Sequence, residues 1–301
     1  MKTITGIMIL ISAVLLCAGC NGGKVKYDAS GNFEATEVIV SSQASGQIMR
    51  FDMSEGDMLQ SGKAIGYVDT IQLHLKKVQL MSNLKSVDSR FYNVSKQVAS
   101  INEQIIKQQT ELKRYENLVK QNAANQKQVD DIRAQIIVLQ KQLAAQTETL
   151  ENSNKSVSNE SASWVAQIEQ IDDLIKKSII SSPIDGTVLA KYAEQGEITS
   201  QGKALFKVAD INNMYLRAYI TSDQLTQMKI GQKVSAFADF GEKDNREYEG
   251  VVTWISDKAE FTPKTIQTRN ERANLVYAVK VSVKNDGYVK IGMYGELKIK
   301  N

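Results

Sequence analysis

The sequence predicts an elongated α+β protein in which a long helical hairpin interrupts a small β-domain. Three observations support this fold class. No glycine or proline occurs in residues 71–180, so this stretch lacks the residues that most often end helices. Apolar residues recur through it in alternating steps of four and three. The flanking segments, 46–68 and 186–208, resemble each other at one constant offset in numbering (186 − 46).

The apolar spacing predicts a coiled coil, because a repeat of 3.5 residues keeps one apolar stripe facing a partner helix. The first half of this seam contains Leu84, Val87, Phe91, Val94, Val98, Ile101, Ile105, Gln108, Leu112, Tyr115 and Val119. The second half contains Val129, Ile132, Ile136, Leu139, Leu143, Gln146, Leu150, Ser153, Val157, Glu160 and Trp164. Periodicity alone fits a straight rod of roughly 160 Å as well as a hairpin of roughly 70 Å.

The repeated flanks favour the hairpin. Three glycine pairs match at the constant offset, and we expect them to be structural: Gly46 with Gly186, Gly56 with Gly196, and Gly62 with Gly202. Two half-modules of this size cannot each bury a core, so they should pack together and return the arm to its origin. The turn is expected near Asn125, in the polar run 120–126.

The returning half of the arm contains a stretch of poor helix formers. Residues 151–163 are rich in Ser and Asn, which have low helix propensity. We therefore expect two helices of roughly 45–50 residues each, with the second one soft or bent in this stretch.

The N-terminus predicts export from the cytoplasm. Lys2 precedes a short apolar run and small residues, which is typical of a signal peptide over residues 1–19. The sequence Ala-Gly-Cys ending at Cys20 indicates a bacterial lipoprotein, with acylation of Cys20 and a tether over residues 20–32. Cys17 stands where such signals usually have Leu, so an ordinary signal peptide with an incidental cysteine is the alternative.

Composition argues against several function classes. The formal net charge is +3 with interspersed charges, so no nucleic-acid footprint is present. No glycine-rich phosphate loop occurs, and the single histidine, His74, has no partner that would form a metal site. We predict that the protein is not an enzyme and has no catalytic residues, metal or cofactor.

The two half-modules begin with Ser-Gly-x-Ile, at Ser45, and with Pro-Ile-Asp-Gly-Thr-Val, at Pro183. These openings resemble the two halves of a biotinyl/lipoyl-type domain, here split into residues 33–70 and 181–210. In carrier domains of that fold the modified lysine lies on the hairpin joining the halves. The helical arm takes that place here and Lys63 and Lys203 occupy other turns, so no cofactor attachment is expected.

A lipoyl-like domain split by a helical hairpin over residues 71–180, behind a lipoprotein signal, resembles the membrane fusion protein (HlyD-type periplasmic adaptor) family. The resemblance implies a small β-barrel over residues 211–301. It also implies a subunit of a tripartite efflux or secretion system that links an inner-membrane transporter to an outer-membrane duct. Such subunits self-associate, commonly as hexamers or trimers of dimers, in the periplasm of Gram-negative bacteria.

Two features favour an ABC-type transporter as the partner, and the second of them fits a major-facilitator-type transporter equally well. The resemblance also favours the inner membrane for the lipid anchor. Residues 260–268 resemble a loop common in ABC-associated adaptors, and the sequence stops where the barrel would be complete. Two alternatives stay open: an envelope spacer with no transport role, and a cofactor-carrier protein.

The resemblance also suggests a contact site at the tip of the arm. Family hairpins that dock onto the duct have an Arg, a Leu four residues later and a Ser seven residues beyond. Arg114 and Leu118 match, and Asn125 stands at the serine position. We expect Leu118 to fill an apolar notch and Arg114 to pair with backbone or acidic groups of the duct. Alternatively, Leu118 lies beside the seam and Arg114 is a solvated surface charge.

Overall fold

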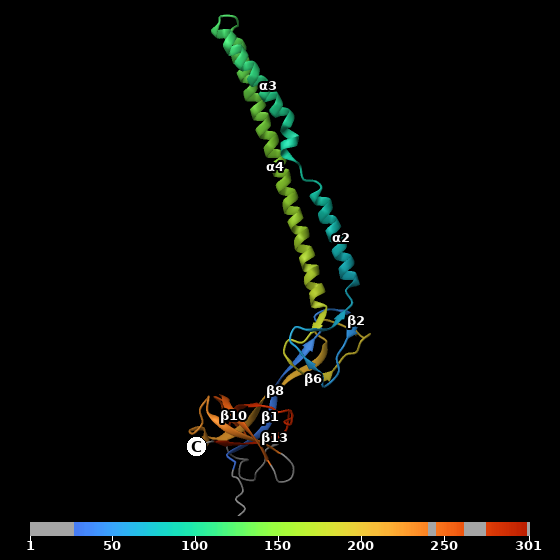
Figure 1. The fold of residues 1–301 in the computed structure, drawn as a ribbon, viewed down its shortest axis with the longest axis vertical. Helices are drawn as coiled ribbons and strands as arrows, with labels where there is room; N and C mark the ends of the chain where they lie inside the picture. Colours follow the sequence, from blue (N-terminus) through green and yellow to red (C-terminus); the bar gives the residue numbers. More distant parts are fainter. Residues whose placement is uncertain (1–26, 240–244, 262–274, 300–301) are drawn as a thin grey trace, which may run out of the picture.

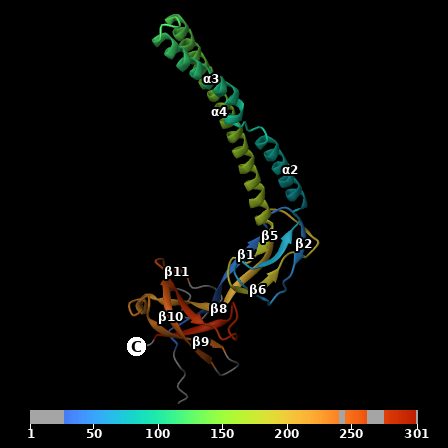
Figure 2. The ribbon, with the colours of Figure 1, turned by 45° about the horizontal axis from the view of Figure 1, so that its top comes forward.

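The computed structural model describes residues 27–239, 245–261 and 275–299. The protein is elongated, with three parts in line along its long axis (Figure 1). A helical arm forms one end, a small β-domain lies at its base, and a β-barrel forms the other end. Figure 2 shows the same order from a second direction. The structure is therefore a mixed α+β fold, as the sequence predicts.

The arm has an outbound half, formed by α2 (Ile71–Asp88) and α3 (Val94–Lys120), and a returning half, formed by α4 (Gln126–Lys177). Ion pairs show that α4 runs antiparallel to the outbound half. Near the base the Lys77 ammonium lies 2.6 Å from Asp172, and near the tip Arg133 lies 2.7 Å from Glu116. The buried seam between the helices contains Leu80, Val87, Val98, Ile105, Val129, Ile136, Leu139, Leu150 and Val157.

The stretch of the returning helix that was expected to be soft or bent is not broken. Residues 151–163 lie inside α4, which is helical over 52 residues. The interruption is in the outbound half instead, at residues 89–93 between α2 and α3, as Figure 1 shows. Polar side chains of 151–163 bind this interruption, which explains the low apolar content of that stretch. Phe91, predicted in the seam, lies in the interruption and is 46% exposed.

The β-domain at the base of the arm repeats its strands at the constant offset seen in the sequence. The first half contributes β2 (Gly46–Phe51), β3 (Met58–Leu59) and β4 (Ala64–Val68). The second half contributes β6 (Gly186–Lys191), β7 (Ile198–Thr199) and the start of β8 (Ala204–Thr221). The short strand β5 (Ile179–Ser181) pairs with β4.

The two halves of this domain exchange strands. β2 pairs with β7, and β3 pairs with β6. The Gly56 N–H donates to the Val188 carbonyl at 2.9 Å, and the equivalent Gly196 N–H donates to Ile48 at 2.8 Å. This pseudo-twofold arrangement buries one shared core, which contains Ile48, Phe51, Met53, Leu59, Ile65, Val68, Ile180, Val188, Ala193, Leu205, Phe206 and Val208.

The six matched glycines lie in this domain in two kinds of environment. Gly56, Gly62, Gly196 and Gly202 have φ between +75° and +92° in tight turns, and Gly46 has φ of +150°. Gly186 has an ordinary φ but packs closely, because a Cβ there would lie 2.5 Å from the Ala209 carbonyl oxygen.

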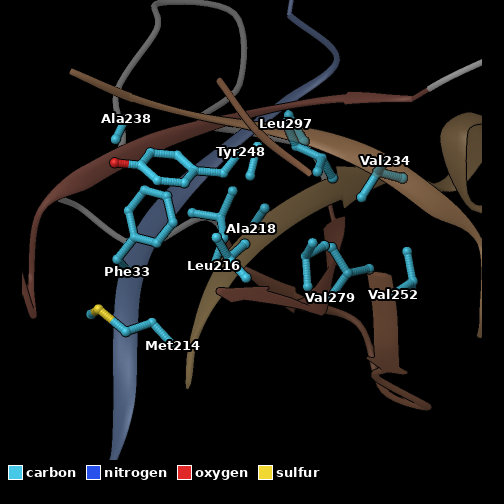
Figure 3. Close-up of a cluster of buried hydrophobic side chains, with 14 of the residues drawn as sticks. Phe33, Met214, Leu216, Ala218, Val234, Ala238, Tyr248, Val252, Val279 and Leu297 are labelled. Carbon is cyan, nitrogen blue, oxygen red and sulfur yellow. The ribbon is translucent and has the colours of Figure 1, made fainter. Parts of the chain in front are cut away.

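Among the described residues, the barrel closes through antiparallel strands in the order β1, β8, β12, β10, β9, β13. These strands are β1 (Ala29–Ser41), β8, β9 (Lys233–Asp239), β10 (Asn245–Ile255), β12 (Leu275–Lys284) and β13 (Tyr294–Ile299). A short helix, α5 (Ser222–Leu225), starts at the capping residue Thr221, and β11 (Glu260–Phe261) pairs with β12. Figure 3 shows the apolar core, in which Phe33, Leu216 and Leu297 are fully buried.

Two predicted boundaries change. Residues expected in the tether belong to the barrel, because Ala29–Asn32 pair with β13 and Ser30–Asn32 also pair with β8. The expected boundary between residues 210 and 211 lies inside β8, because β1 and β8 each run through both β-domains and join them. The signal peptide, Cys20 and the part of segment 260–268 after Phe261 lie outside the described residues. Within the described ranges, no helix is both long enough and apolar enough to cross a bilayer.

Candidate docking tip of the helical arm

The tip of the arm is a tight turn built by backbone hydrogen bonds. Asn122 adopts a left-handed conformation with φ of +56°. The Ala123 N–H donates to the Leu118 carbonyl at 2.8 Å, and the Asn122 N–H donates to Val119 at 3.0 Å. These two bonds form a Schellman motif, in which a left-handed residue, usually Gly and sometimes Asn, ends a helix. The polar run predicted to turn therefore contains the residue type that this conformation tolerates.

Asn125 begins the returning helix. Its side-chain oxygen accepts the Lys127 N–H at 3.0 Å, and it forms a capping box with Gln128. Ser and Asn are both strongly preferred at this N-cap position. The exchange of Ser for Asn at the third position of the family pattern therefore preserves the helix start. The side-chain oxygen of Asn125 thus has a structural role within the arm as the N-cap acceptor.

Arg114 and Leu118 lie on the same face of α3, because residues four apart are neighbours on a helix. The Arg114 guanidinium is 3.5 Å from Glu111, its side chain is 64% exposed, and it lies 5.5 Å from the Tyr115 ring centroid. Exposed ion pairs of this kind contribute about 0–1 kcal/mol, so Arg114 can exchange Glu111 for another acceptor at little cost. Leu118 is half-buried between the seam and the surface.

The two halves of the arm are tied together just below this face. The Glu116–Arg133 ion pair crosses from α3 to α4, and Val129 is buried beneath the turn. The turn and its supports hold Leu118 in a defined position at the far end of the molecule. The structure thus places Arg114 and Leu118 together on one face and Asn125 across the turn as a structural cap.

The base of the arm also carries an exposed apolar surface that was not predicted from the sequence. Ile71, Leu75, Val78 and Met81 on α2 are each at least 50% exposed. Their spacing of four, three and three places them in one stripe, and this pattern was visible in the sequence. Beside the stripe, a groove between α2 and α4 is lined by apolar atoms of Met81, Leu84, Val165 and Ile168. We call Ile71, Leu75, Val78 and Met81 the α2 stripe.

Comparisons with known proteins agree with this architecture. Proteins called "UPF0194 membrane protein" from Yersinia pseudotuberculosis are 25% identical over 311 residues, covering 94% of this chain and 93% of the relative. The membrane fusion protein Spr0693 of Streptococcus pneumoniae has a similar fold, with a TM-score of 0.57 at 16% identity over 90% of this chain and 97% of that one. MacA from Actinobacillus actinomycetemcomitans gives a TM-score of 0.53 at 19% identity, covering 89% of this chain and 76% of that one.

A family model covers the split β-domain together with the arm. Residues 36–211 match the family described as "RND MFP, barrel-sandwich hybrid domain". This match includes both halves of the pseudo-twofold domain and the whole inserted hairpin, and it spans more than half of the sequence. The chain therefore belongs to the membrane fusion protein family of adaptors.

Proposed function

We propose that this protein is the periplasmic adaptor of a tripartite efflux or secretion system and that the tip of its arm docks onto an outer-membrane duct. The observation that supports this most is the reach of the arm. The 52 residues of α4 extend over ~78 Å at 1.5 Å per residue. The arm therefore holds the Arg114–Leu118 face of α3 far from both β-domains.

The transporter and the membrane anchor are further parts of the proposal. We infer acylation of Cys20 from the Ala-Gly-Cys signal, and we favour the inner membrane for the anchor because the family resemblance implies an inner-membrane transporter as the partner. We favour an ABC-type transporter because of the resemblance of segment 260–268. The family match carries the RND name, so an RND-type transporter is the competing partner. Purification of the tagged full-length protein from native membranes, with mass spectrometry of the associated transporter, distinguishes the two classes.

Ring assembly, as a hexamer or a trimer of dimers, would give the arm a neighbour. The α2 stripe supports this part of the proposal, because four exposed apolar side chains in one stripe mark a contact surface. A second copy of the chain, packed beside the first, would cover it.

The tip is tested by Leu118→Asp in the full-length protein. A carboxylate at this position would be desolvated without a partner in an apolar notch. The loss of a hot-spot side chain costs about 2 kcal/mol or more. We expect at least about a tenfold loss of export and of cross-linking to the outer-membrane duct.

The control is Ile106→Asp, which places the same charge on α3 at a side chain that is exposed and away from the tip. We expect this variant to retain export. Undiminished export and cross-linking with Leu118→Asp, at normal protein levels, would refute docking through the tip. An export defect in both variants would point to general damage to the arm.

A further inference from the structure

The interruption of the outbound half is held by side chains of the opposite helix. The Asn154 side-chain amide forms two hydrogen bonds with the backbone of Tyr92. Its oxygen accepts the Tyr92 N–H at 2.8 Å, and its nitrogen donates to the Tyr92 carbonyl at 2.8 Å. Arg90 pairs with Glu160 at 2.6 Å. Side chains of α4 thus replace hydrogen bonds that a continuous helix would make within the outbound half.

Each end of the interruption is also closed. The Ser161 hydroxyl donates to Asp88 at 2.6 Å, where α2 ends. Asn93 caps α3 by accepting the Lys96 N–H at 3.1 Å. The interruption is a bound structure with defined partners, and we call residues 89–93 the joint.

The joint does not shift the two halves of the arm along each other. The separation in sequence between Lys77 and Glu116 (116 − 77) equals the separation between their partners Arg133 and Asp172 (172 − 133). Since α4 is continuous between those partners, the outbound half covers the same axial length as an unbroken helix of equal residue number. The joint therefore occupies the length that the same residues would occupy in a helix.

The joint does not change the heptad phase either. Val87 below it and Val98 above it are both buried in the seam, and Val94 between them keeps the spacing of seven and four. Phe91 stands at the seam position between Val87 and Val94 in the sequence, yet its side chain is turned out and is nearly half exposed. Phe91 would take its place in the apolar seam only if the joint were helical.

We propose that the joint is a two-state element. In the clamped state, Asn154 and Asn93 hold residues 89–93 open, and the neighbouring aromatic side chains Phe91 and Tyr92 are exposed. In the second state, α2 and α3 form one helix and Phe91 enters the seam.

The change needs no slip or rotation of the rest of the arm, because axial length and heptad phase are already those of a continuous helix. It exchanges the Asn154 and Asn93 bonds for main-chain bonds and the burial of Phe91. The clamped joint leaves the outbound half articulated, and the helical joint stiffens it. This inference is independent of what the tip contacts.

The test uses Asn154→Leu in the full-length protein. This change removes the clamp and offers Phe91 an apolar partner in the seam. The matched control is Asn159→Leu, since Asn159 is exposed on the same helix. A second route to the same state is Asn93→Leu, which removes the cap of α3.

Cleavage after Arg90, Phe91 and Tyr92 by trypsin and chymotrypsin, mapped by mass spectrometry, reports the open joint, because proteolysis of an opened segment follows its population. We expect Asn154→Leu and Asn93→Leu to slow this cleavage by about tenfold or more and to protect the amides of 89–93 from hydrogen exchange. Asn159→Leu should behave as the unmodified protein does.

Adding Phe91→Ser to Asn154→Leu should restore fast cleavage, because the helical state then has no apolar side chain to bury. Unchanged or faster cleavage in both Asn154→Leu and Asn93→Leu would overturn the proposal and leave the joint as a fixed break. Slow cleavage that persists after Phe91→Ser would equally overturn it, since seam burial would then play no part. Circular dichroism confirms in each case that the arm is still folded.

Discussion

The close packing of Gly186 allows the most quantitative prediction for the β-domain. A methyl group at this position would lie 2.5 Å from the Ala209 carbonyl oxygen and 3.1 Å from a methyl of Val208, where ordinary contacts begin at 3.4 Å. The shortfall against Ala209 is 0.9 Å (3.4 − 2.5). Because the clash is with backbone in the β6–β8 ladder, a side-chain rotation cannot relieve it.

We therefore expect Gly186→Ala to cost about 3 kcal/mol, at the upper end of the range for overpacked interiors. Gly196 provides the comparison. A methyl group there meets no atom within 4 Å, but φ is +92°. Left-handed strain of an L-residue costs about 1–2 kcal/mol, offset in part by the lower entropy of the unfolded chain. Gly196→Ala should thus cost about 1 kcal/mol.

Hydrogen exchange measured by mass spectrometry checks both values, because circular dichroism is dominated by the arm. A loss of about 3 kcal/mol should accelerate exchange in β6 and the start of β8 by roughly 100-fold, and a loss of about 1 kcal/mol by roughly fivefold. Equal effects of the two substitutions, or a larger effect of Gly196→Ala, would refute the argument from close packing.

Two further predictions concern the barrel and the tip. Burial and a hydrogen bond to Asp286 raise the pKa of Tyr248 to about 12. Because the unfolded tyrosine releases its proton near pH 10, this contribution to stability is complete below pH 10 and is lost as the pH rises to about 12. Tyr248→Phe should destabilise the barrel by about 1–2 kcal/mol at pH 7. Its free energy of unfolding should also decline less over that pH range, measured by urea unfolding with Trp254 fluorescence in a Trp164→Phe background. At the tip, Val129→Ala should lower the free energy of local opening, measured by hydrogen exchange, by about 1–2 kcal/mol, because the Val129 side chain is 2% exposed. Val138→Ala is the control: its side chain is 58% exposed, and the loss should be less than about 0.5 kcal/mol.

Long-range self-similarity and heptad spacing were sufficient to predict the helical hairpin and the split β-domain, whereas the barrel was expected only from the family resemblance. The matching turns at Gly56 and Gly196 imply two half-modules that share one core. The two halves must therefore pack together, which requires the helical segment between them to fold back as a hairpin. The observed strands follow the same offset from β2 and β6 onward. Both signals are strong because they extend over many residues and do not depend on any single side chain.

The position of the interruption could not be predicted, because it depends on contacts between the two halves of the arm. Propensity pointed to residues 151–163, since Ser and Asn are poor helix formers. In the structure Asn154, Glu160 and Ser161 stay helical and direct their side chains at residues 88–92 of the outbound half. A polar stretch in one helix of a coiled coil can therefore mark a break in its partner.

Local chemistry at the tip was partly visible in the sequence. Asn125 followed three residues later by Gln128 is a capping-box signature, so the start of α4 could have been predicted. The left-handed conformation of Asn122 could be recognised only from the turn geometry. At the other end, the short polar residues 29–32 resembled a tether, because strand pairing through the backbone leaves little trace in side-chain type.

The three parts of the molecule are nested in the sequence: the barrel strands enclose the β-domain, and the β-domain encloses the arm. Asp28 and Ile299, joined by a hydrogen bond in the barrel, are 271 residues apart, while Glu116 and Arg133 at the tip are only 17 residues apart. Closing a long loop costs more entropy than closing a short one, so contacts near in sequence can form first. Pairing at the tip would bring the ends of the arm together, which shortens the loop that the β-domain must close. On this argument we expect the barrel strands β1 and β13 to meet last. Loop-closure entropy thus favours assembly of this elongated fold from the far tip of the arm back toward its base.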